Sequence, residues 1–125
     1  MNKLLIIAGM LFLFGCSKDE APKPIPVIVI NTPMENQHFV MGDTIHITGS
    51  VTHSIPLAEI GIHMTDLTSK VEFFHEHHSV SNITTYNFDT KFIIPSNAKT
   101  SFKVEIEAMD TETTEVTKEI TITIN

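Results

Sequence analysis

Histidines are the residues of this chain whose types and spacing most clearly suggest chemistry, and there are seven in 125 residues. Three of them fall within four positions, in the stretch Phe74-His75-Glu76-His77-His78. Alternate side chains of a β-strand point to the same face, so His75 and His77 are expected about 7 Å apart on one face. Two neutral imidazoles at that separation suit a transition-metal ion.

A preceding strand supplies further ligands if residues 66–70 form the turn of a β-hairpin. With that turn, Glu59 lies opposite His77, and His63 is a diagonal neighbour of His75. Three imidazoles and a carboxylate on one face suit zinc, copper(II) or nickel, of which we predict zinc or copper. We therefore predict a metal site whose main ligands are His63, His75 and His77, completed by His78 or Glu59.

The pairing register decides whether these ligands meet. A register one residue longer would place His78 opposite Glu59 and separate the predicted ligands. One alternative is that the cluster is ordinary polar surface, and another is a pH sensor, since clustered imidazoles charge together below about pH 6.5. The remaining histidines, His38, His46 and His53, are predicted to be solvated surface residues.

The elements that must position these side chains are β-strands. Beyond Pro26 no stretch has the 3.6-residue period of a helix, whereas short runs of β-branched and aromatic residues alternate with polar ones. The pattern predicts an all-β, immunoglobulin-like antiparallel β-sandwich of about seven strands over residues 27–125. The predicted strands are 27–30, 44–51, 58–65, 71–78, 86–94, 102–108 and 120–124.

The N-terminus has the layout of an export signal. A positive start precedes an apolar run at residues 4–14, which is shorter than the roughly 20 residues of a membrane-spanning helix. The run leads into Gly15 and Cys16, and Cys16 is the only cysteine. This ending resembles the lipobox of bacterial lipoproteins, which implies a signal peptide at 1–15, lipid attachment at Cys16 and a Pro-rich tether at 16–26. An ordinary signal peptide with an incidental cysteine is the alternative.

Composition narrows the function classes. Fifteen acidic residues against eight basic ones give a net charge of -7, which argues against nucleic-acid binding, because that requires a basic face. Hydrophobic residues make up 42% of the chain, enough for one packed domain. No spacing supports a catalytic triad or a carboxylate pair, so we expect a protein that is not an enzyme.

Taken together, the signal, the β-domain and the histidines resemble an uncharacterised family of histidine-containing, Ig-like lipoproteins of Bacteroidota. The matching features are the lipobox at Cys16, the pair Ile62-His63 and the cluster at 75–78. The acidic stretch 17–20 resembles the signal that sends such lipoproteins to the cell surface. The resemblance implies an outer-membrane lipoprotein that is held to the membrane through its lipid and displayed at the cell surface, with a periplasm-facing anchor as the alternative. It implies no activity, so two hypotheses stand: a metal-binding lipoprotein, and an adhesion module that meets a protein partner in the envelope.

Overall fold

The computed structural model describes residues 20–98 and 100–125, so the predicted signal peptide at 1–15 and Cys16 lie outside the described residues. All regular secondary structure in these ranges is β, which confirms the predicted class. No helix among the described residues is long and apolar enough to cross a membrane. The strands are β1 (Val27–Thr32), β2 (His38–Phe39), β3 (Thr44–Asp66), β4 (Glu72–Ile93), β5 (Ser101–Asp110) and β6 (Glu115–Ile124).

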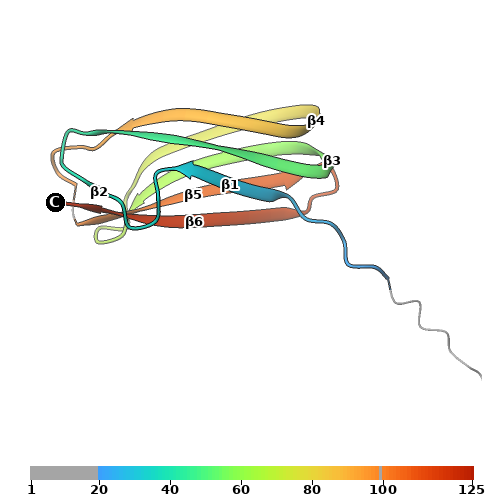
Figure 1. Ribbon diagram of the computed structural model, residues 1–125, viewed down its shortest axis with the longest axis horizontal. Coiled ribbons are helices and arrows are strands. Elements are labelled where there is room, and N and C mark those ends of the chain that lie inside the picture. The colour runs from blue at the N-terminus through green and yellow to red at the C-terminus, as the bar shows by residue number, and fades with distance from the viewer. Residues whose placement is uncertain (1–19, 99) are drawn as a thin grey trace, which may run out of the picture.

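The architecture is built on one long hairpin that is folded in half. β3 and β4 have 23 and 22 residues and pair with each other almost throughout, with irregular pairing between Thr52 and Leu57. The first half of β3 also pairs with β1, and its second half with β5. The sheet therefore curls into two facing layers (Figure 1).

The strand count follows from this folding. β3 and β4 each contain two of the predicted strands, because the backbone stays extended through the bend while its pairing partners change. The short strand β2 pairs in parallel with the end of β6 and had no signal in the sequence. The described residues accordingly form six continuous strands.

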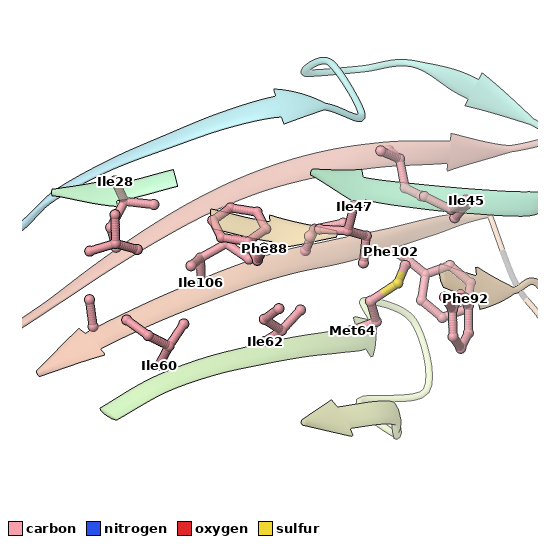
Figure 2. Close-up of a cluster of buried hydrophobic side chains, with 14 of the residues drawn as sticks. Ile28, Ile45, Ile47, Ile60, Ile62, Met64, Phe88, Phe92, Phe102 and Ile106 are labelled. Atoms are coloured by element: carbon pink, nitrogen blue, oxygen red, sulfur yellow. The ribbon is translucent and has the colours of Figure 1, made fainter. Parts of the chain in front are cut away.

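The predicted alternation produces the core. In β5, the side chains of Phe102, Val104 and Ile106 are fully buried while their neighbours face outward. They meet apolar side chains from the other strands between the layers (Figure 2). The ring of Phe102 lies 5.6 Å from that of Phe73 and 5.9 Å from that of Phe92, measured between centroids. Such interdigitated apolar burial is the main force that stabilises the sandwich.

A buried polar pair ties the bend of β3 to the end of β5. Nε2 of His53 lies 3.0 Å from Oδ2 of Asp110, and both side chains are shielded from solvent. Oδ1 of Asp110 also accepts hydrogen bonds from the backbone N–H groups of Glu112 and Thr114. Burial acts to raise the pKa of Asp110, but the hydrogen bonds from Thr114, His53 and Glu112 hold that pKa below its ordinary value. The prediction of a solvated His53 was therefore wrong, because its partner comes from a strand distant in sequence.

Candidate metal centre

The turn between β3 and β4 is held by Asp66. Its Oδ1 accepts hydrogen bonds from the backbone N–H groups of Thr68 and Ser69, at 2.8 and 2.9 Å. Lys70 adopts a positive φ of 61°, and its N–H donates to the carbonyl of Asp66. This side-chain-capped turn occupies residues 67–71 and fixes where the two strands begin to pair.

The observed register differs from the predicted one by two residues. His63 lies directly opposite His75, and His77 lies opposite Gly61. The predicted pairing of Glu59 with His77 was wrong, since Glu59 pairs with Ser79. A two-residue shift leaves every side chain on the face where it was predicted, because the period of a strand is two. The three histidines consequently share the outward face.

Their rings form a compact group. One ring nitrogen from each of His63, His75 and His77 lies within 4.8 Å of the others. The ring of His63 packs edge-on against those of His75 and His77, at centroid distances of 4.6 and 5.3 Å, and the latter two stack at 4.4 Å. Tetrahedral zinc, with Zn–N bonds of about 2.0–2.1 Å, needs nitrogens about 3.3 Å apart. Small rotations of the exposed His75 and His77 toward the buried His63 would close that gap.

A β-bulge brings in a carboxylate that sequence reasoning missed. The register shifts by one residue at Phe73, which has no partner in β3. The extra residue reverses the alternation, so Glu72 lies on the same face as His75 instead of the opposite one. The one sequence signal for it was the adjacent pair Phe73 and Phe74, since strict alternation cannot direct both side chains toward the core that they pack against.

Each of the three imidazoles forms a hydrogen bond between its Nδ1 and a glutamate carboxylate. Glu72 accepts from Nδ1 of His75 at 2.8 Å and from Nδ1 of His63 at 3.3 Å. Glu59 accepts from Nδ1 of His77. Burial acts to raise the pKa of Glu72, but the hydrogen bonds from the two histidines outweigh it and lower that pKa. An ionised carboxylate at each Nδ1–H favours the tautomer whose Nε2 is free to bind a metal.

The buried Nε2 of His63 is the least satisfied atom of the group. It has no hydrogen-bond partner among the described residues, and it lies 3.4 Å from Oε2 of Glu107. A Cβ on Gly61 would approach that nitrogen to 2.9 Å, so only glycine leaves it room. A neutral Nε2 and a carboxylate oxygen are both acceptors, and a cation between them would satisfy both. Glu107 went unpredicted because it reaches this position from β5, where it pairs with Gly61.

A shallow hollow adjoins the same spot. Gly61 forms part of its lining, and half of the lining residues are glutamates. The lining residues are Glu59, Gly61, Glu107, Ala108, Met109 and Glu115. The imidazole group therefore lies next to an accessible, negatively charged surface that attracts cations.

A lysine partly neutralises the far side of this face. Nζ of Lys103 lies 2.5 Å from Glu105 and 2.8 Å from Glu119. A hydrogen bond shared with Glu119, together with burial, raises the pKa of Glu105. These groups satisfy one another, which leaves Glu59, Glu72 and Glu107 as the carboxylates that contact the histidine group.

The structure does not bring His78 to the group. By alternation it lies on the inner face, where it pairs with Ile60, and its ring packs against Tyr86 at 5.6 Å. Glu59 is on the correct face, but it contacts Nδ1 of His77 and so positions that ring. His38 lies on β2, where its Nδ1 is 3.4 Å from Nδ2 of Asn125. His46 lies on the first half of β3, opposite Lys91 and far along the strand from His63.

Comparisons with known proteins bear on the fold. No family model and no curated protein sequence matches this chain. Its structure is similar to that of a Niemann-Pick type C2 protein from the Japanese carpenter ant, with a TM-score of 0.54 and 11% identity over 82% of this chain and 92% of that one. It is also similar to the sporulation control protein Spo0M from Bacillus subtilis, with a TM-score of 0.51 and 8% identity over 82% of this chain. The chain spans 49% of Spo0M. At such identities the likeness shows the fold alone, a β-sandwich.

Proposed function

We propose that this chain is a cell-envelope lipoprotein whose β-sandwich binds one transition-metal ion, zinc or copper, through Nε2 of His63, His75 and His77. The observation that carries the proposal is the buried, unpartnered Nε2 of His63, which faces Glu107 beside two further imidazoles. Binding, and not catalysis, is the activity that we assign to it.

The donor set favours a borderline metal ion. Three imidazoles match zinc and copper(II) better than calcium or magnesium, which take oxygen ligands. Glu107 is the nearest group to complete the coordination, since its Oε2 already lies 3.4 Å from Nε2 of His63. Glu72 and Glu59 would act from outside the coordination sphere, fixing ring orientation and raising the basicity of the nitrogens.

The envelope location rests on Cys16 and the tether. We propose lipid attachment at Cys16 and anchoring in the outer membrane, with the domain at the cell surface. Residues 20–26 form no strand, and Lys23 contacts Glu112 at 3.3 Å, so the tether leaves from the end of the sandwich where β5 turns into β6 (Figure 1). Labelled palmitate should enter the wild-type chain and not a Cys16→Ser variant.

We also propose the immunoglobulin-like class for the sandwich. Counting the two halves of β3 and β4 separately gives one layer of β1 with the first half of β3 and the second half of β4. The other layer then contains the remaining halves with β5 and β6. Layers of three and four antiparallel segments support an Ig-like order.

Calorimetric titration of the purified full chain with zinc and with copper(II) tests the metal site. We expect one ion per chain, and at least about 100-fold weaker binding for the double variant His75→Ala/His77→Ala, because it leaves a single imidazole. His46→Ala is the matched control, as it removes an exposed histidine outside the group.

Two outcomes of the titration would contradict the proposed site. Absence of binding up to about 100 µM metal would contradict the metal site and favour a protein-interaction module. Unchanged affinity in the double variant would show that metal binds elsewhere.

A further inference from the structure

One edge of the sandwich is a long strand with no neighbour on its outer side. Among the described residues, β4 pairs with β3 alone, over a strand of 22 residues (Figure 1). Its outward N–H and C=O groups therefore have no strand to pair with. Such an edge is a template for the addition of another strand.

The inner face of this edge also holds a carboxylate whose hydrogen bonding is incomplete. Oε2 of Glu76 is buried and has no hydrogen-bond partner among the described residues. Nε2 of His78 is 3.6 Å away, beyond hydrogen-bond distance. Burial and the negative charge of Glu76 raise the pKa of Tyr86, which packs against His78. The carboxylate thus lies in a partly desolvated place where a second imidazole would stabilise it.

We infer that a second copy of this chain pairs with the open edge of β4, antiparallel and centred on His77. In this register Glu76 lies opposite His78 of the partner subunit, and Phe74 lies opposite Val80 of the partner subunit. Two-fold symmetry makes each contact occur twice. An acceptor that faces an imidazole, and apolar side chains that face each other, stabilise antiparallel pairs.

Neighbouring registers lose this complementarity. A pairing centred on Glu76 places two carboxylates opposite each other, and one centred on His78 places Glu76 opposite Val80 of the partner subunit. Pairings that join an odd to an even position set inner side chains against outer ones, which the pleat excludes. The dimer does not require a metal ion, so it goes beyond the proposed function. Failure of one proposal therefore leaves the other unaffected.

Disulfide trapping of the full chain tests the register. In a Cys16→Ser background, His77→Cys places the two new sulfurs in facing positions, within reach of a disulfide. Ser79→Cys is the matched control on the same face, because its two copies would lie four residues, or about 13 Å, apart along the strands. In EDTA and under mild oxidation we expect covalent dimers with His77→Cys and at least about tenfold fewer with Ser79→Cys. Equal trapping of the two, or none, overturns the inference.

A charge exchange provides a second test that is independent of cysteine. Glu76→Lys should shift the chain from dimer to monomer when its molar mass is measured by light scattering with correction for detergent. Glu76→His combined with His78→Glu restores the facing pair and should restore the dimer. Circular dichroism verifies that each variant folds. A wild-type mass equal to that of a single chain at about 100 µM chain, or a dimer that Glu76→Lys leaves intact, refutes the proposed interface.

Discussion

The substitution Gly61→Ala, which adds one methyl group, tests whether the space above Gly61 holds the metal ion. A Cβ there would lie 2.9 Å from Nε2 of His63 and 3.2 Å from Oε2 of Glu107. His63 is packed in place, whereas Glu107, whose side chain is 33% exposed, can move away. We expect Gly61→Ala to fill the position that the ion needs and to lower zinc affinity at least about tenfold.

The effect of Gly61→Ala on stability is the balance of two opposing terms. Replacing a strand glycine by alanine gains about 0.5–1 kcal/mol, because glycine loses more backbone freedom on folding. Overpacking a close contact costs about 1–3 kcal/mol. Since His63 is buried and its nitrogen is the nearest atom, overpacking should prevail, with a net loss of about 1 kcal/mol in the free energy of unfolding.

A double-mutant cycle isolates the contact between the new methyl group and Nε2 of His63. In a His63→Ala background the close approach is gone, so Gly61→Ala should become neutral or stabilising. Urea unfolding in EDTA measures stability, and calorimetry measures zinc binding. An equal loss of stability in both backgrounds would show that Gly61→Ala does not act through His63. Zinc affinity unchanged by Gly61→Ala would show that the ion does not occupy the space above Gly61.

Three further variants test the carboxylates around the site, the buried pair of His53 and Asp110, and the core. Glu72→Gln keeps the size of the side chain but removes the charge that orients two imidazoles, so calorimetry should show about 10-fold weaker zinc binding; unchanged binding would contradict the assigned role. The lowered pKa of Asp110 stabilises the fold above about pH 3.9, and this contribution is lost as pH falls through the folded pKa. Thermal unfolding of Asp110→Asn should accordingly show a lower midpoint at pH 7 and a weaker acid dependence, whereas an acid profile identical to the wild type would argue against it. Phe102→Ala should cost about 3–5 kcal/mol in urea unfolding, because the ring is fully buried; a loss below about 1 kcal/mol would mean that the layers close over the space.

Alternation made the shared face of the histidines predictable from the sequence. An error of two residues in register changed which residues faced each other but moved no side chain to the other face. His63, His75 and His77 were thus found despite a wrong partner for Glu59. The same rule argues against His78, which we predicted as a possible fourth ligand and which the structure places on the inner face, opposite Ile60.

The carboxylates could not be predicted in the same way. The face on which Glu72 lies is set by the bulge at Phe73, because one extra residue reverses the alternation for the residues that precede it in the strand. Glu107 and the partner of His53 come from β5, so both required knowledge of which distant strands pair. The bend inside β3 was equally hidden, because its residues stay extended while the strand passes from one layer to the other.

All three histidines belong to one hairpin, between positions 63 and 77. A loop that short costs little entropy to close, so the unfolded chain would retain part of its affinity for the same ion. Stabilisation by a ligand depends on how much better the folded state binds it than the unfolded state does. Zinc should therefore raise the melting temperature by less than its affinity for the native protein implies, and a nascent chain would acquire its metal before the two layers meet.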